Sequence, residues 1–290
     1  MLKAPKAALA AIRPHQWVKN LLVFMPLLAG HAIDAVVWQR GATAFVVFCL
    51  TASAVYLIND FLDLEADRAH HSKHRRPLAS GALSPAQGVG LLAALTGSAL
   101  WVSAGLPVSF RGVVGGYLVL NLAYSLGLKK VVMLDVVVLV SFYALRLVAG
   151  AEATGIFLSN WLLAFSMFFF FGLAMIKRYT EILRAGPKPT LPNRGYQPGD
   201  EAAVLALGSA SSLLSILVLT LYLNSPDVKG LYDHPERLWL LAPVLFYWVS
   251  HVWLLAHRNR IDDDPVVYAF KEKTSYGCAL LAGCVIWFSL

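Results

Sequence analysis

Apolar segments of about twenty residues recur along the 290-residue chain, and they constrain its fold more than any other feature. A helix needs about 20 apolar residues to cross the hydrocarbon core of a membrane. Hydrophobic residues make up 58% of the sequence and charged residues 14%, whereas soluble domains have about 45–50% and about 25%. We therefore predict an all-α, polytopic membrane protein with nine transmembrane helices. They are expected at residues 17–33, 41–62, 86–105, 109–127, 131–150, 158–176, 202–223, 238–256 and 274–290.

Basic residues are distributed unevenly between the loops that join these segments. Nineteen of the 24 Lys and Arg residues fall in the N-terminal segment and in every second loop, and four fall on the opposite side. Because cytoplasmic loops carry the excess of positive charge, we expect the N-terminus inside the cell. The same rule accounts for the net charge of +7, so we expect no nucleic acid partner.

Two smaller features exclude other classes of protein. Cys49, Cys278 and Cys284 each lie in an apolar stretch and form no CxxC pair, which favours buried hydrophobic roles over a disulfide or a metal site. The N-terminal residues 1–17 show no signal-peptide pattern. We expect this segment to be retained.

The most concentrated polar feature is the acidic segment 59–67 at the cytoplasmic end of the second predicted helix. Asn59, Asp63 and Asp67 are spaced i, i+4, i+8, and Asp60 lies three residues before Asp63, so one helix face carries all four. Aligned carboxylates repel one another unless a cation holds them, and hard oxygen ligands beside phosphate oxygens suit Mg²⁺. Acids are also disfavoured at a helix C-terminus. We interpret these four residues as Mg²⁺ ligands; a solvated helix end is the alternative.

A basic segment follows directly, with His70, His71, Lys73, His74, Arg75 and Arg76. Arginine binds phosphate through two parallel hydrogen bonds and lysine binds it as a point charge. An acidic metal site followed by a basic clamp is the arrangement that a magnesium diphosphate needs. An ordinary positive-inside loop is the alternative, and a zinc site is disfavoured because no cysteine is near.

Further polar residues lie at other predicted cytoplasmic helix ends. Each has a simpler structural explanation as well: an interfacial anchor for Lys19, a surface pair for Lys177 and Glu181, and a structural ion pair for Arg146 with Glu152. The candidates for substrate contact outside the two segments above are Lys19, Tyr124, Lys129, Lys130, Arg146, Lys177, Arg178, Tyr179 and Glu181.

Segment 59–67 matches the NDxxDxxxD motif of the UbiA superfamily of intramembrane prenyltransferases. Residues 13–20 resemble that family's start of helix 1, and Lys73 to Pro77 resemble its KxxRP continuation. The resemblance covers nearly the whole chain. It implies one transmembrane domain over residues 1–290, with nine helices in a ring around a central cavity. It also implies that the Asp motif binds Mg²⁺, with Mn²⁺ as an alternative, and the diphosphate of a donor.

The chain departs from most family members after the sixth predicted helix. Most members carry a second motif of the DxxxD kind there, whereas residues 177–181 read KRYTE. The chain resembles the decaprenyl-phosphate phosphoribosyltransferase branch, which lacks that motif, in RPHQWVKN, YSLGLKK, RLVAGAEATG and KRYTE. In that branch the donor is phosphoribosyl pyrophosphate and the acceptor is a polyprenyl phosphate.

The resemblance implies that Asp60, Asp63 and Asp67 carry catalysis by holding Mg²⁺ on the donor diphosphate. Asn59, Lys73, Arg75 and Arg76 are expected to contact substrate with the candidates named above. The implied partners are the lipid bilayer, a polyprenyl phosphate or diphosphate and phosphoribosyl pyrophosphate, and a homo-oligomer is compatible with the sequence. The implied location is the bacterial inner (plasma) membrane, with the active site facing the cytoplasm.

Two other functions stay open. One is transfer of a polyprenyl chain from its diphosphate to an aromatic or quinone-precursor acceptor, as in most of the family. The other is a transporter with an ion site at residues 59–67. Transporter sites usually lie near the bilayer midplane on broken helices, often with an internal repeat. Since the acids lie at a helix end and no repeat is visible, the sequence favours an enzyme.

Overall fold

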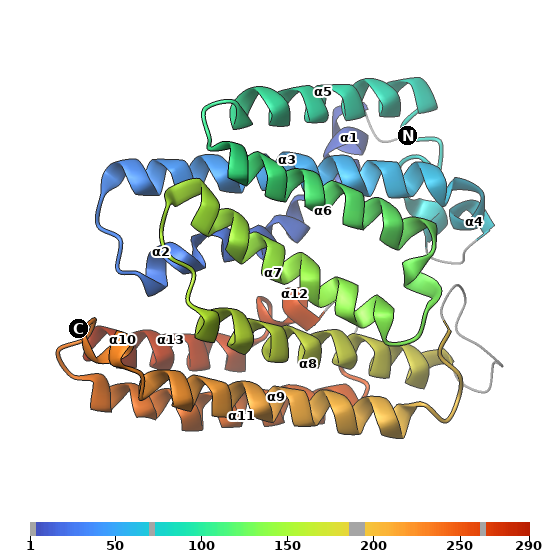
Figure 1. Ribbon diagram of the computed structural model, residues 1–290. Coiled ribbons are helices and arrows are strands. Elements are labelled where there is room, and N and C mark those ends of the chain that lie inside the picture. Colours follow the sequence, from blue (N-terminus) through green and yellow to red (C-terminus); the bar gives the residue numbers. More distant parts are fainter. Residues whose placement is uncertain (1–3, 70–72, 186–194, 262–264) are drawn as a thin grey trace. The chain divides into compact units, whose positions relative to one another are not determined.

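The computed structural model describes residues 4–69, 73–185, 195–261 and 265–290, and every regular element in these ranges is helical (Figure 1). The chain divides into two compact units. Unit 1 comprises residues 1–125 and 145–157, and unit 2 comprises residues 126–144 and 158–290. Helix α7 (Leu134–Thr154) gives its first half to unit 2 and its second half to unit 1.

Unit 1 is built around the 28-residue helix α3 (Ala35–Leu62). Asp34 caps its N-terminus by accepting a hydrogen bond from the Val36 N–H at 2.7 Å, which satisfies one of the unpaired amides of the first turn. The other elements of the unit are α1 (Ala4–Ile12), η1 (Pro14–Phe24), α2 (Met25–Ala29), α4 (Leu64–Ala69), η2 (Lys73–Arg75), α5 (Pro85–Ser103) and α6 (Val108–Leu126).

Helix α5 packs along α3, and this packing fixes the segment that follows the acidic motif. Ser84 and Gln87 form a reciprocal capping box at the start of α5, which fixes where that helix begins. A Cβ on Gly88 would meet the Phe61 ring at 2.7 Å, so the two helices approach closely. Leu57, two residues before the acidic segment, and Leu78, two residues after the basic segment, are buried in one cluster with residues of α1. One hydrophobic cluster therefore holds the start of the acidic segment and the end of the basic segment.

The first expected span differs from the prediction. In place of one helix over residues 17–33, the chain forms the 3₁₀ helix η1 and then the short α-helix α2. Pro14 and Pro26 each stand in the first turn of their helix, where the missing N–H does no harm. The change from 3₁₀ to α-helix therefore falls next to Pro26.

Unit 2 contains η3 (Leu128–Lys130), α8 (Asn160–Ala185), α9 (Glu201–Leu223), α10 (Pro226–Lys229), η4 (Pro235–Leu240), α11 (Leu241–His257), α12 (Pro265–Ala269) and α13 (Lys273–Trp287). Helices α8 and α9 run side by side (Figure 1). Small residues permit this: a Cβ on Gly172 would lie 2.0 Å from the Ser212 hydroxyl, and the Ser211 hydroxyl donates to the Phe168 carbonyl at 2.8 Å. Close contacts between small residues are typical of helix packing in membranes.

Six helical segments of the described residues are long and apolar enough to cross a membrane. They correspond to α3, α5, α7, α8, α9 and the continuous stretch η4–α11. Among the other expected spans, α13 has 15 residues and η1–α2 is broken. The full set of nine spans and the inside N-terminus remain predictions.

Candidate active site

The acidic segment forms two helices, where the spacing predicted one. Helix α3 ends at Leu62, Asp63 takes a non-helical conformation (φ −97°, ψ 9°), and α4 begins at Leu64. Hydrogen bonds still bridge the break, because the Asp63 N–H donates to the Asn59 carbonyl at 2.9 Å and the Asp67 N–H to the Asp63 carbonyl at 2.8 Å. The chain therefore turns at Asp63 while its i, i+4 spacing is kept.

Two of the three predicted catalytic carboxylates are buried. Asp60 and Asp67 are each 2% exposed, whereas Asp63 is half-buried. A buried carboxylate is unfavourable unless it is paired or binds a metal. The structure therefore has to compensate two negative charges within a few residues of each other.

Two arginines supply that compensation. Arg76 donates to Asp67 Oδ2 at 2.5 Å and to Asp60 Oδ1 at 3.1 Å. Arg13 donates to the same Asp60 Oδ1 at 2.6 Å. Arg76 was expected to contact substrate, and here its guanidinium bridges the carboxylates. Arg13 was not among the candidates, because nothing in the sequence indicates a contact across 47 residues.

The second oxygen of Asp60 has no such partner. Asp60 Oδ2 is buried and accepts no hydrogen bond from the described part of the chain. A buried unsatisfied oxygen in a native structure indicates a missing partner such as an ion or water. Over the same residues, no group of three or more Asp, Glu, His or Cys side chains is assembled for a metal.

The donors of the segment nevertheless fit Mg²⁺. They are carboxylate and amide oxygens, which this cation prefers, and Mg²⁺ commonly takes only one or two carboxylates together with phosphate oxygens. Asn59 contributes an amide whose oxygen accepts a hydrogen bond from Ser125 at 2.6 Å, which ties the end of α3 to the end of α6. Asp60, with its unsatisfied oxygen, is the best-placed ligand.

The rest of the predicted basic clamp lies next to this site. Lys73 and Arg75 are exposed in η2, and the Arg76 N–H donates to the Lys73 carbonyl at 2.9 Å. Two histidines of the clamp, His70 and His71, lie outside the described residues. The exposed cations are accessible to a soluble anion.

The N-terminal motif 13–20 is fixed against α3. Trp17 donates to the Ser53 hydroxyl at 3.1 Å, and that hydroxyl donates to the Ile12 carbonyl at 2.9 Å. Arg13 itself has a left-handed backbone, with φ 49°, which is uncommon for a residue other than glycine. These contacts point the Arg13 side chain back over Tyr56 and toward Asp60. Lys19 is half-buried in the same 3₁₀ helix.

Arg146 lies in the interior of unit 1, where ionisable residues of membrane helices are usually found. It is 4% exposed and donates to Asn20 Oδ1 at 2.8 Å and to the Tyr117 hydroxyl at 3.2 Å. Its guanidinium also lies over the rings of Phe48 and Tyr117. Arg146 thereby joins η1 to α6 and α7. Tyr124, two residues before the end of α6, is half-buried.

A second polar network lies in unit 2. Arg178 and Asp135 are both fully buried and are joined by a 2.6 Å ion pair, and Arg178 also donates to Glu181. The Tyr196 hydroxyl donates to Asp135 at 2.9 Å. Burial, with the neighbouring Asp135 carboxylate, raises the pKa of Tyr196, so its hydroxyl stays a donor. Asp135 and Tyr196 were not candidates for the site, and Arg178, expected to contact substrate, is enclosed in this network.

The other candidates of unit 2 lie on α8 and in η3. Tyr179 is 3% exposed, and its hydroxyl is 2.9 Å from His257 Nδ1. Lys177 is half-buried on α8, and Lys129 and Lys130 form part of η3. The predicted site residues thus fall into one set in unit 1 and another in unit 2.

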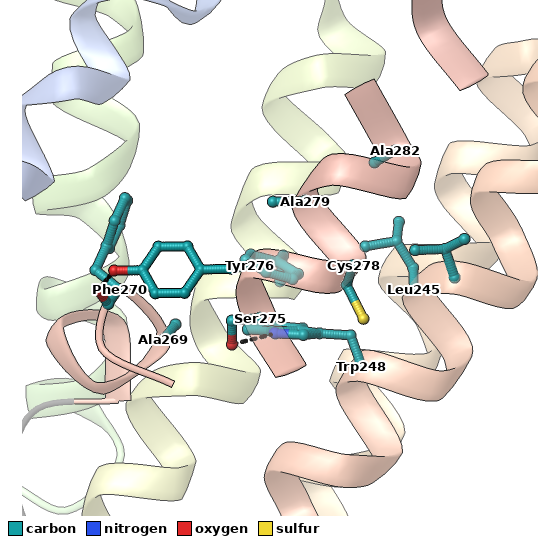
Figure 2. A pocket seen from close by; sticks show the side chains of 11 residues that line it. Leu245, Trp248, Ala269, Phe270, Ser275, Tyr276, Cys278, Ala279 and Ala282 are labelled. Carbon is teal, nitrogen blue, oxygen red and sulfur yellow. Dashed lines mark hydrogen bonds between the residues drawn. The ribbon is translucent and has the colours of Figure 1, made fainter. Parts of the chain in front are cut away.

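Unit 2 also contains an apolar pocket of about 290 Å³ (Figure 2). Trp248 and Leu245 of α11 line it with Tyr276, Ala279 and other residues of α13. Polar side chains of the lining form hydrogen bonds within the protein. Trp248 donates to the Ser275 hydroxyl at 2.9 Å, and Tyr276 donates to the Phe270 carbonyl. Such a lining suits hydrocarbon and offers no site for a charge.

Comparison with known proteins shows the family to which the chain belongs. The model of the UbiA prenyltransferase family matches residues 21–273. The chain has 15% identity and a TM-score of 0.70 with a UbiA homologue of Archaeoglobus fulgidus bound to GPP and Mg²⁺, over 97% of this chain and 99% of that one. The chain belongs to the UbiA prenyltransferase family, and its fold and apolar helices are those of an integral membrane protein.

Several relatives have a higher sequence identity to the chain than this structure does, and their names differ. An uncharacterised protein of Sinorhizobium fredii is 40% identical over 92% of this chain and 53% of its own length. The nodulation protein NoeC of Azorhizobium caulinodans is 33% identical over 93% of this chain and 89% of its own. The decaprenyl-phosphate phosphoribosyltransferase of Corynebacterium glutamicum is 42% identical over 65% of this chain and 59% of its own. The chain therefore spans little more than half of the first and third of these proteins.

Proposed function

We propose that the chain transfers a phosphoribosyl group from phosphoribosyl pyrophosphate to a polyprenyl phosphate, with Mg²⁺ as cofactor. The observation that carries this proposal is the buried Asp60–Asp67 pair with its unsatisfied Oδ2 and its two arginines. Such a site combines hard oxygen ligands with guanidinium groups, which is what a metal-bound diphosphate requires.

The second network favours this donor over a prenyl diphosphate. Most family members place a second acidic motif where this chain has residues 177–181, and here Arg178 closes an ion pair with Asp135. Segment 177–181 therefore contributes a buried arginine, paired with Asp135, in place of a second pair of acidic ligands. The similarity to decaprenyl-phosphate phosphoribosyltransferases supports the same choice.

The proposed reaction needs positioning and charge neutralisation more than acid–base chemistry. An oxygen of the acceptor phosphate forms a bond to C1 of the ribosyl group while the bond from C1 to the diphosphate breaks. A phosphate monoester has a second pKa of about 6, so the acceptor is already ionised at neutral pH and no general base is required. When bound, Mg²⁺ would neutralise charge on the departing diphosphate.

Residues of the chain supply the remaining roles. Asn59, Asp60, Asp63 and Asp67 would hold the metal, and Arg76 lies where it can contact the diphosphate oxygens. Lys73, Arg75, Lys129, Lys130 and Lys177 are the further cations assigned to the two phosphorylated substrates.

The lipid tail of the acceptor requires an apolar surface. The pocket between α11 and α13 is close to the lower end of the range for ligand sites, about 300 Å³. We assign it to part of the polyprenyl chain.

The runner-up function is prenyl transfer to an aromatic acceptor, which the family membership favours. Purified protein is given phosphoribosyl pyrophosphate and a polyprenyl phosphate in one reaction, and geranyl diphosphate and an aromatic acid in a second. The proposal predicts a new polar lipid in the first reaction only, dependent on Mg²⁺. A prenylated aromatic product in the second reaction alone would establish the runner-up.

A further inference from the structure

Asp60 is shared between two arginines through one of its oxygens. Arg13 and Arg76 both donate to Oδ1, at 2.6 and 3.1 Å, while the buried Oδ2 accepts no hydrogen bond from the described residues. Arg76 has a second carboxylate partner in Asp67. Among the described residues, Arg13 forms an ion pair with Asp60 alone, whereas Arg76 forms one with Asp60 and one with Asp67.

Charge balance explains why both arginines are present. Asp60 and Asp67 carry two negative charges in a buried setting, and Arg13 and Arg76 carry two positive charges. A divalent cation on the same carboxylates would leave two positive charges in excess. Like charges held a few ångströms apart in a partly buried setting repel each other more strongly than they do in water. At least one of the two arginines would then need another anion as its partner.

The Arg13 side chain is partly accessible to solvent, although its main chain is held in place. Its side chain is 22% exposed, and its guanidinium lies 5.0 Å from the centroid of the Tyr56 ring. The backbone around it is held by contacts of its neighbours, with Ser53 joining Trp17 to the Ile12 carbonyl. The side chain can therefore change partners while the segment that carries it stays in place.

We propose that Arg13 is an internal counter-cation that holds Asp60 when no divalent ion is bound, and that it exchanges Asp60 for the donor diphosphate when the ion binds. Arg13 is then a positioning and anion-binding residue of the site. The exchange couples the binding of metal and diphosphate. The bound metal frees Arg13 from Asp60 for the diphosphate, and the bound diphosphate neutralises the excess positive charge that the metal introduces. This inference rests on the proposed diphosphate-binding function of the site.

Mn²⁺ binding to the purified full-length protein tests the exchange without any turnover. The free-ion electron paramagnetic resonance signal is titrated with and without inorganic diphosphate, for the wild type, Arg13→Gln and Arg68→Gln. Without diphosphate, Arg13→Gln should bind Mn²⁺ about tenfold more tightly, because a competing cation is gone. With diphosphate, the wild type should gain affinity, and Arg13→Gln should lose most of that gain.

Arg68→Gln is the matched control. Arg68 is exposed on α4, one residue after Asp67, so the variant also removes one positive charge near the acidic segment, at a residue with no ion pair to Asp60 among the described residues. Its Mn²⁺ affinity should stay within about twofold of the wild type, because exposed charges are screened. If Arg13→Gln does not fold, Arg13→Lys should keep the metal affinity of the wild type and lose part of the diphosphate effect.

Equal or weaker Mn²⁺ binding by folded Arg13→Gln, with the diphosphate effect intact, would overturn the exchange and leave Arg13 a structural residue. A protein that binds Mn²⁺ and diphosphate as expected but transfers no phosphoribosyl group would overturn the proposed reaction and leave the role of Arg13 standing.

Discussion

Arg178 and Asp135 form a 2.6 Å ion pair in which neither side chain is exposed to solvent. The pair joins α8 to the start of α7, and the Tyr196 hydroxyl also donates a hydrogen bond to the Asp135 carboxylate at 2.9 Å. Arg178 belongs to segment 177–181, where the family resemblance leads us to expect an acidic motif that this sequence does not contain. A side chain held in this way stabilises the fold of unit 2, and its guanidinium is not accessible to a substrate in this state.

Removing one partner of this pair should therefore be costly. Arg178→Met leaves a buried, uncompensated Asp135, and breaking a buried pair in this way costs about 3–5 kcal/mol. We expect a marked fall in the thermal unfolding temperature in detergent. The double variant Arg178→Met, Asp135→Asn removes both charges of the buried pair and keeps an acceptor for Tyr196, so it should recover much of the loss. Wild-type stability in the single variant would contradict the structural role.

The acidic segment allows a matched pair of variants. Asp60→Asn removes the buried carboxylate with the unsatisfied oxygen, whereas Glu65→Gln removes an exposed acid of the same segment. We expect Asp60→Asn to weaken Mn²⁺ binding by about 100-fold and to abolish transfer, and Glu65→Gln to change neither. Equal effects of the two variants would show that the site responds to general negative charge and not to Asp60 as a ligand.

The close approach of η1 to α7 predicts an effect of a single methyl group. A Cβ on Gly150 would lie 2.0 Å from the Val23 carbonyl oxygen, whereas one on Gly97 in α5 would meet nothing within 4 Å. Gly150→Ala should destabilise unit 1 by about 1–3 kcal/mol through overpacking. Gly97→Ala should be neutral or slightly stabilising, because alanine is the better helix former. Thermal unfolding in detergent measures both, and equal unfolding temperatures would refute the close contact.

Much of this site follows from sequence pattern, and the part that does not is long-range. The helical spacing of segment 59–67 predicts that Asp60 and Asp67, seven residues apart, lie on one face, and both side chains are buried. The break at Asp63 is not encoded by proline or glycine, so local rules predict a continuous helix. Contacts such as Arg13 with Asp60 and Arg178 with Asp135 join residues 47 and 43 positions apart. No local propensity reports on such pairs.

The first helix illustrates the same limit. Hydropathy predicts an apolar span over residues 17–33 but cannot distinguish a 3₁₀ helix from an α-helix. The 3₁₀ geometry of η1 places Trp17 against Ser53 and Asn20 against Arg146. Those tertiary contacts, which no window of the sequence contains, decide the local conformation. Tertiary packing commonly overrides helix propensity in this way.

The apolar pocket predicts a dependence on lipid length. Ala279→Phe places a bulky ring in the lining of the pocket, while Leu280→Phe changes the next residue of α13, which is 70% exposed and not part of the lining. If the polyprenyl chain uses the pocket, Ala279→Phe should reduce transfer to a long-chain acceptor by about tenfold or more relative to a short-chain one. Leu280→Phe should leave that ratio unchanged. An unchanged ratio in Ala279→Phe would remove the pocket from the acceptor site.

The proposed reaction transfers a phosphoribosyl group, and not a prenyl group, from phosphoribosyl pyrophosphate to a polyprenyl phosphate. Phosphoribosyl pyrophosphate labelled separately in its ribose ring and in its diphosphate tests this most directly, in the presence of Mg²⁺ and a polyprenyl phosphate. The account predicts that the ribose label enters the lipid phase while an equal amount of the diphosphate label is released to water, and that Asp60→Asn abolishes both. Release of diphosphate without ribose in the lipid, or no reaction while a prenyl diphosphate is consumed, would contradict it.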